Sequence, residues 1–174
     1  MGFAGSERTR RRRGLGVLVA GVLVLGILAA ACGPVDQTPA PPGCPADPPD
    51  PITQTILNRT NGDRSGEGLP ALFWNARLAC LADEWSRYMR DTGSFRHRDL
   101  SATIRSPGFE GYAGLAENIM VGPGNMDGNS IENTWLNSPP HLANIMGNYD
   151  TIGIGFARGA DGRLWATENF GRHS

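Results

Sequence analysis

TIGIGFA (residues 151–157) and RLWATENF (residues 163–170) set the architecture of this chain. Both segments are rich in the β-branched and aromatic residues that fit a pleated, half-buried surface. The residues between them, RGADG (158–162), contain an Asp-Gly pair. Two β-rich runs around such a turn predict a β-hairpin near the C-terminal end of the sequence.

The clearest helix lies upstream of this hairpin, between Asn75 and Gly93. Asn75 is a good N-cap residue, and apolar residues follow it at i, i+4, i+7 and i+11, namely Leu78, Ala82, Trp85 and Met89. This spacing predicts an amphipathic helix with one buried face, which Gly93 ends.

Three shorter helices are predicted over residues 52–61, 130–137 and 141–146. The first is expected to end at Asn61-Gly62, and the last follows two prolines, which suit a first helical turn. Residues 94–128 contain six glycines and are expected to be mostly loop. Helices in the first part and a hairpin at the end predict an α+β fold, with helices packed on an antiparallel sheet.

Length and charge exclude several classes of protein. A length of 174 residues argues for one folded domain. All 16 basic residues are arginine, and the lack of lysine excludes Schiff-base chemistry and Walker-type nucleotide binding. Five arginines lie within residues 8–13, and beyond residue 31 the acidic residues outnumber the arginines. A net acidic domain without a basic stripe is not expected to bind nucleic acid.

The N-terminal residues 1–31 have the pattern of an export signal. RTRRRR (8–13) precedes an uncharged apolar stretch (15–31), which ends in three alanines followed by Cys32. This arrangement resembles a bacterial lipoprotein signal, in which the cysteine is lipidated and becomes the first mature residue. It predicts an extracytoplasmic protein anchored by lipid to the membrane at the cell surface. The alternatives are a secreted protein with an ordinary cleaved signal and an uncleaved membrane anchor.

Residues 32–51 are rich in proline and predict an extended tether ahead of a domain at 52–174. Cys44 lies in this tether and Cys80 in the predicted long helix. Because an exported protein meets an oxidising compartment, we expect a Cys44–Cys80 disulfide. The alternative is two unpaired thiols, with Cys80 acting as a small buried hydrophobic residue.

His97, Glu117 and His141 are the candidate functional residues. Two histidines and one glutamate form a ligand set that Zn²⁺ accepts, with a fourth position open to water. The helix start at His141 would keep its imidazole neutral. The spacing lacks a His-Glu-x-x-His motif, so histidines with structural roles are the alternative. The third histidine, His173, is penultimate and is expected to be frayed.

Other polar and aromatic residues have competing interpretations. Glu117 with Glu132, or with Glu168, is a possible glycosidase-type carboxylate pair. The alternative places Glu132 on a solvated helix face and Glu168 at a strand edge. Structural roles are predicted for two asparagines, as bridges to loop backbone, and for four tryptophans, as core anchors: Asn118, Asn144, Trp74, Trp85, Trp135 and Trp165.

Several segments, read in order, resemble the bacterial branch of the CAP superfamily, the cysteine-rich secretory, antigen five and pathogenesis-related group one proteins. The resemblance covers about residues 52–171. Its motifs are a first helix ending in Asn58-Arg59, LPALFWNARLACLADEWSRYM (69–89), His97 after a Phe, Gly111-Tyr112, AENI (116–119), WLNSPPHLANIM (135–146), TIGIGFA and LWATENFG (164–171).

The resemblance implies a three-layer α-β-α sandwich with a central antiparallel sheet, and a secreted or surface-bound protein. It also implies a cleft in which His97, Glu117 and His141 hold Zn²⁺ or another divalent ion. Ala116 and Pro140 replace glycines of the family pattern, and Asn148-Tyr149 stands where other members have a His-Tyr pair. The implied ligand set therefore has three residues instead of four.

The family does not fix an activity, so three functions remain open. The first is a non-enzymatic, membrane-tethered binding module of the cell envelope, with a lipid, glycan or protein ligand. The second is a metal-dependent hydrolase of peptide or peptidoglycan, in which the three residues would hold a metal that activates water. The third is a structural partner protein with a vestigial cleft.

Overall fold

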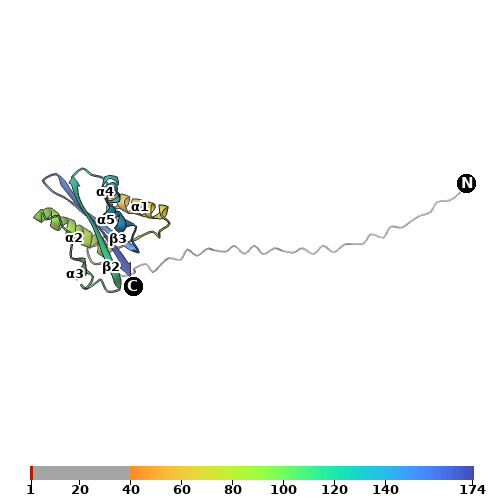
Figure 1. Ribbon diagram of the computed structural model, residues 1–174, viewed down its shortest axis with the longest axis horizontal. Helices are drawn as coiled ribbons and strands as arrows, with labels where there is room; N and C mark the ends of the chain where they lie inside the picture. The colour runs from red at the N-terminus through yellow and green to blue at the C-terminus, as the bar shows by residue number, and fades with distance from the viewer. Residues whose placement is uncertain (2–39) are drawn as a thin grey trace. The chain divides into compact units, whose positions relative to one another are not determined.

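The computed structural model describes Met1 and residues 40–174. The chain divides into two units, Met1–Gly33 and Pro34–Ser174, and every described helix and strand belongs to the second unit (Figure 1). Residues 2–31 of the predicted signal, Cys32 and the first part of the predicted tether, up to residue 39, lie outside the described residues. None of the helices within the described part combines the length and apolar character that a membrane crossing requires.

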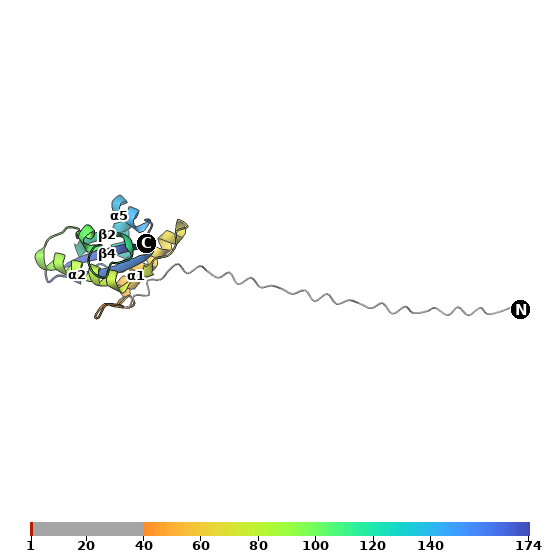
Figure 2. The same ribbon diagram turned by 90° about the horizontal axis from the view of Figure 1, so that it is seen from below.

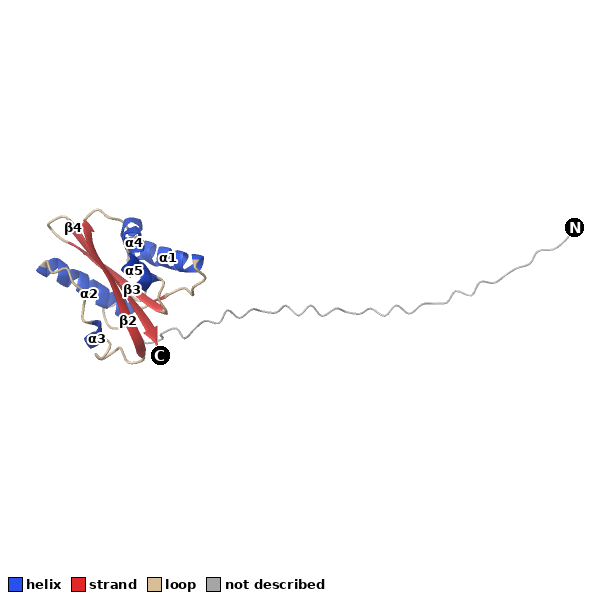
Figure 3. Ribbon diagram, viewed as in Figure 1, coloured by secondary structure: helices blue, strands red, loops and turns tan. Residues whose placement is uncertain are grey.

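The fold is α+β, with helices on both faces of a four-stranded sheet (Figure 3). In chain order the elements are α1 (Pro51–Gly66), β1 (Phe73–Trp74), α2 (Ala76–Thr92), α3 (Leu100–Thr103), β2 (Tyr112–Pro123), α4 (Gly128–Leu136), α5 (Pro139–Ile145), β3 (Thr151–Arg158) and β4 (Arg163–His173). The strand order is β1-β3-β4-β2, so β2 is an edge strand. The predicted hairpin is the β3–β4 pair.

The sheet is mixed, whereas a wholly antiparallel sheet was predicted. β2 and β3 both pair antiparallel to β4, but the two-residue strand β1 pairs parallel to β3, with Phe73 opposite Thr151. Parallel pairing is possible here because the chain from α2 to α5 lies between β1 and β3 and supplies the long connection that parallel strands need.

Helix α2 covers one face of the sheet, as predicted from its apolar spacing (Figures 1 and 2). The Asn75 side chain accepts a hydrogen bond from the Leu78 N–H at 3.0 Å, and Gly93 ends the helix in the left-handed conformation, with φ of 68°. A Cβ atom at Gly153 or Gly155 of β3 would collide with the α2 backbone. These two glycines therefore let the helix lie directly on the sheet.

Helices α1, α4 and α5 form the layer on the opposite face, where the larger apolar core lies. Its buried members include Ile56, Ile131, Trp135, Ile145, Ile152, Ile154, Leu164 and Phe170. Arg64 of α1 is also buried there, and its guanidinium donates to the carbonyls of Pro70, Ile145 and Gly147 at 2.9, 2.7 and 2.9 Å. These bonds hold the end of α5 against α1.

Three predictions are wrong: the end of the first helix at Asn61-Gly62, the loop over residues 94–128 and the frayed His173. α1 continues past Asn61-Gly62, because the Asn61 side chain is fixed by both backbone groups of Leu72. Residues 94–128 contain the twelve-residue strand β2, whose central residues are buried on both faces and so show no polar alternation. His173 is the last residue of β4, and its Nδ1 lies 2.8 Å from Asp150 Oδ1.

Candidate functional site

Glu117 is the centre of the candidate site. It lies on the edge strand β2, and its side chain is fully buried. Its Oε1 accepts hydrogen bonds from His97 Nδ1 at 2.9 Å and from the Arg98 backbone N–H at 3.0 Å. Because a carboxylate only accepts, Nδ1 is the protonated nitrogen of His97, and Nε2 is left for a ligand. The His97 side chain is 57% exposed, so Glu117 orients a ring that faces solvent.

His141 reaches the same strand from the other layer. Its backbone carbonyl accepts a hydrogen bond from the Asn118 side chain at 3.2 Å, and Asn118 points to the face of β2 opposite to Glu117. Burial, and then the nearby charge of His97, lower the pKa of His141 below its ordinary value. The imidazole is therefore neutral at pH 7, as predicted, although burial is the main cause.

Asn118 and Asn144 join α5 to the edge strand. The Asn144 amide donates to Asn118 Oδ1 at 2.9 Å and to the backbone carbonyl of Glu117 at 3.3 Å. Asn118 is itself fully buried. The structure thus places His97, Glu117 and His141 around one short stretch of β2, with two asparagine amides between the layers.

The arrangement does not fit the implied three-residue zinc site. His97 and Glu117 are hydrogen-bonded to each other, so Glu117 orients the ring instead of sharing an ion with it. Within the described residues, no three His, Cys, Asp or Glu side chains form a group able to hold a metal ion. Zinc binding by these residues stays a prediction, without support from this geometry.

A stack of arginine and aromatic side chains adjoins His97 and was not predicted. The guanidinium carbons of Arg96 and Arg98 lie 5.5 and 4.7 Å from the Trp85 ring centroid, and Trp85 stacks on Tyr88 with centroids 4.6 Å apart. The Trp85 indole N–H donates to the Arg96 carbonyl at 3.0 Å, which fixes the segment that follows α2. The sequence signal for this surface was Arg-His-Arg at 96–98, following aromatic residues on an exposed helix edge.

The two arginines of this stack differ in their partners. Arg98 is mostly buried and lies 3.6 Å from the exposed carboxylate of Glu84. Arg96 is exposed, and its guanidinium donates to the Tyr88 hydroxyl at 2.8 Å. In the described part of the chain, no carboxylate forms an ion pair with Arg96. Arg96 therefore presents to solvent a positive charge that no carboxylate of the described residues neutralises, stacked on the Trp85 and Tyr88 rings.

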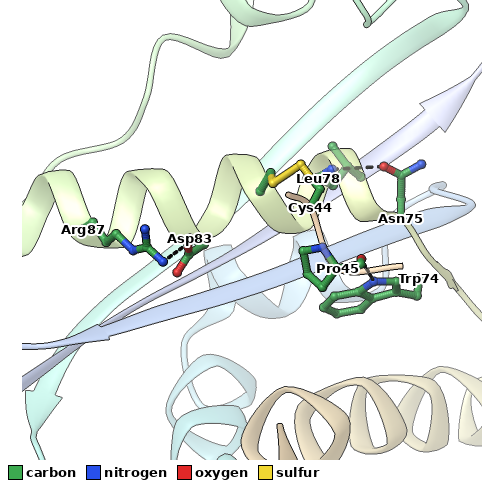
Figure 4. Close-up of a disulfide and its surroundings, with 8 residues drawn as sticks. Cys44, Pro45, Trp74, Asn75, Leu78, Asp83 and Arg87 are labelled. Carbon is green, nitrogen blue, oxygen red and sulfur yellow. Dashed lines mark hydrogen bonds and ion pairs between the residues drawn. A yellow bond between two sulfur atoms is a disulfide. The ribbon is translucent and has the colours of Figure 1, made fainter. Parts of the chain in front are cut away.

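The Cys44–Cys80 disulfide is present and confirms the predicted pairing (Figure 4). It fastens the segment before α1 to α2, and the Trp74 indole N–H donates to the Pro45 carbonyl at 3.0 Å beside it. A pocket of about 610 Å³ lies next to the disulfide, between this segment, α2 and β3, and the Asp83–Arg87 ion pair is part of its lining.

The alternative interpretation, which placed Glu132 and Glu168 at the surface, is wrong. Neither residue pairs with Glu117 either. Both are fully buried, and both Oε1 atoms lie near the Thr60 hydroxyl, at 3.0 Å for Glu132 and 3.2 Å for Glu168. Glu168 is opposite Asn118 in the sheet, so it faces the layer away from the Glu117 side chain. The buried positions of α4 are Gly128, Ile131, Glu132 and Trp135, and their helical spacing was the available signal that Glu132 points inward.

A family model, described as CAP, the cysteine-rich secretory protein family, matches residues 57–170. The chain belongs to the CAP family. YkwD of Bacillus subtilis, itself described as uncharacterised, is 29% identical over 125 residues, which cover 67% of this chain and 46% of YkwD. This chain thus spans less than half of that relative.

Solved structures agree with the CAP fold. An extracellular SCP-domain protein of Bacillus anthracis superposes with a TM-score of 0.58 at 30% identity, covering 68% of this chain and 39% of that one. An outer surface protein of Borrelia burgdorferi gives a TM-score of 0.63 at 18% identity, over 71% of this chain and 93% of that one. The second likeness shows the fold alone. By their descriptions, the Bacillus anthracis protein is extracellular and the Borrelia burgdorferi protein is an outer surface protein.

Proposed function

We propose that this CAP protein is a non-enzymatic binding module of the cell envelope, and that its ligand is an anionic glycan. The observation that carries the proposal is Arg96, an exposed guanidinium stacked on Trp85 and Tyr88 without a carboxylate partner in the described residues. Arginine forms paired hydrogen bonds with phosphate or carboxylate groups. The neighbouring rings of Tyr88 and Phe95 are exposed and offer apolar surface to sugar rings.

The neighbouring residues support an extended ligand better than a small one. Phe95 is 51% exposed, and His97 on the other side of Arg96 presents its Nε2 to solvent. Glu117 fixes the His97 ring before any ligand arrives, which lowers the entropy lost on binding. A polymer lying along residues 95–98 would contact an aromatic ring, a guanidinium and an imidazole in succession.

The membrane tether belongs to the same proposal. Lipidation at Cys32 and a tether over residues 32–51 would hold the domain near envelope polymers. The extracellular or surface descriptions of the relatives support export. Cys32→Ala should move the protein from the membrane fraction to the medium. Equal membrane retention of Cys32→Ala and wild type would refute lipid anchoring at this residue.

The ligand proposal is tested by sedimentation with purified cell walls. The probes are walls that keep their anionic glycopolymers and the same walls stripped of them by acid. Wild type should bind the intact walls, and Arg96→Gln should bind about tenfold more weakly, the loss expected for one charged contact of about 1.4 kcal/mol. Arg105→Gln, a change at another exposed arginine, is the matched control. Equal binding to stripped walls, or equal loss in both variants, would refute the proposal.

Metal-dependent hydrolysis of peptide or peptidoglycan is the alternative carried by the resemblance. In the described residues His97 and Glu117 bond to each other, and no three-ligand group forms. A structural partner role is distinguished by the same sedimentation experiment, since such a protein would bind neither wall preparation.

A further inference from the structure

Three elements bring two acidic side chains together inside the core. Thr60 comes from α1, Glu132 from α4 and Glu168 from β4, and all three are 0% exposed. The Thr60 hydroxyl oxygen lies 3.0 Å from one oxygen of Glu132 and 3.2 Å from one oxygen of Glu168. We call Thr60, Glu132 and Glu168 the buried acid cluster. The buried acid cluster is separate from the candidate site.

The cluster has too few donors for two ionised carboxylates. Its oxygens can accept from the single Thr60 hydroxyl proton and from the Asn118 amide, which donates to Glu168 Oε2 at 3.1 Å. Glu132 Oε2 has no hydrogen-bond partner among the described residues. One added proton supplies a further donor to the cluster. A protonated Glu168 donates to the Thr60 oxygen, Thr60 donates to Glu132, and the Asn118 bond remains.

The surrounding charges do not neutralise the cluster. From α1, Asp63 adds negative charge near Glu132, and Arg59 adds a positive charge, but the Arg59 guanidinium donates to Asn129 and Asn133. β2 contributes the neutral Asn118 amide. α5 contributes the His141 carbonyl, which reaches the cluster through Asn118. Within the described part of the chain, neither Glu132 nor Glu168 forms an ion pair.

Burial has the corresponding effect on protonation. It raises the pKa of Glu132 to about 7, with Asp63 acting in the same direction and Thr60 and Arg59 opposing it. Burial, followed by the charge of Glu132, raises the pKa of Glu168 well above its ordinary value. The geometry and the direction of both pKa shifts agree that the pair keeps at least one proton at neutral pH.

Asn118 links the buried acid cluster to the candidate site through hydrogen bonds. Its amide group donates to Glu168 and also to the backbone carbonyl of His141, at 3.2 Å. Its Oδ1 accepts from Asn144 of α5 at 2.9 Å. The orientation of one amide therefore depends on Glu168 and sets the contact between α5 and the edge strand β2.

We propose that Glu168, sharing a proton with Glu132 through Thr60, is a positioning residue that holds α5 and His141 against β2, and that loss of this proton at alkaline pH loosens α5. The ionised pair repels, the cluster separates, and Asn118 loses its fixed acceptor. The candidate site would then be ordered at neutral and mildly acidic pH and loosened above it. This inference concerns the position of α5 and does not depend on which ligand the protein binds.

The first test is direct observation of the proton. In the mature chain with ¹³C-labelled glutamate, the carboxyl carbon shift of Glu168 should show a protonated acid at pH 7 and titrate only above it. The exposed Glu84 serves as the reference signal in the same spectra. Ionisation of both Glu132 and Glu168 by about pH 5.5 would overturn the proposal.

The second test follows His141 and α5. The His141 ring-proton shift should move a second time above pH 7, where its own imidazole no longer titrates. Amide protection of α5 should fall about tenfold more than intrinsic exchange predicts between about pH 7 and pH 9. Glu168→Gln supplies an uncharged donor of the same shape, so it should abolish both effects, whereas Glu84→Gln should leave them. A persistent second step in Glu168→Gln, or its absence in wild type, would overturn the positioning role.

Discussion

Glu117 and Glu168 are buried carboxylates on adjacent strands, one register position apart, and they face opposite layers. Glu117 receives two N–H donors, from the His97 ring and the Arg98 backbone, on a segment that reaches solvent. Glu168 receives one amide and a hydroxyl shared with Glu132. One oxygen of Glu117 thus accepts two N–H bonds, while Glu168 belongs to a cluster in which Glu132 Oε2 has no donor among the described residues.

The difference follows from what each layer contains. On the Glu117 side, the segment after α2 is irregular and can turn a backbone N–H toward the strand. On the Glu168 side, α1 and α4 are regular helices, and the N–H groups in a helix interior are used by the helix itself. A carboxylate facing such helices depends on side-chain donors or on an added proton.

The largest expected effect is the pH dependence of stability caused by the buried acid cluster. A pKa of about 7 for Glu132 in the folded state, against the ordinary 4.5, means that the native state binds more protons than the unfolded state between these values. Stability is therefore fully present below about pH 4.5 and falls as pH rises through 7. For Glu132 alone the loss is roughly 3 kcal/mol.

Urea unfolding at several pH values checks this prediction. His141 acts in the opposite direction below about pH 6.5, because its pKa is lowered, so the decline is clearest above that value. Glu132→Gln/Glu168→Gln should remove most of the decline and be more stable than wild type at pH 8. Glu84→Gln serves as the exposed control. Parallel profiles for wild type and the double variant would show that the carboxylates are ionised in both states.

The Thr60 hydroxyl should have the next largest effect. Thr60→Val removes the one donor shared by Glu132 and Glu168 and should cost about 1–3 kcal/mol of unfolding free energy. The loss should be greater at pH 8 than at pH 5, since protonated carboxyls can bond to each other. Thr60→Ser keeps the hydroxyl and should recover most of the stability. A pH-independent loss would indicate a packing role only.

A smaller effect is expected for Glu117→Gln, opposite in sign to that of Glu168→Gln. Glu117→Gln weakens charge-assisted bonds from His97 and Arg98 and should destabilise the protein by about 1 kcal/mol at pH 8. The same substitution at Glu168 should stabilise it there. Thermal unfolding of the two single variants measures both signs in one experiment. Stabilisation by Glu117→Gln would remove the contrast between the two faces.

The sequence predicted much of the fold because its strongest patterns are local. The apolar spacing and Asn75 cap of α2, and the Asp-Gly hairpin, depend on neighbouring residues. β2 was missed because its central residues are buried on both faces and glycines lie near its ends, which leaves no alternation. His97, Glu117 and His141 were named as candidates from ligand chemistry, but only the resemblance indicated that they lie together, since their proximity depends on tertiary packing across an edge strand. The Thr60 cluster was missed because its members are far apart in sequence.

The smallest expected effect concerns zinc at the Glu117 face. The hydrogen bond between His97 and Glu117 leaves no preformed three-ligand group in the described residues. Calorimetric titration of zinc into wild type and into His97→Ala/His141→Ala should therefore differ less than about threefold in affinity. Saturable one-to-one binding that vanishes in the variant would show that these residues rearrange to bind metal. Any such binding should weaken below about pH 6, because histidine must be deprotonated to ligate. Protonation would then control both faces of the sheet. Histidine protonation would control metal binding at the Glu117 face, and carboxyl protonation would control the hydrogen bonds at the Glu168 face.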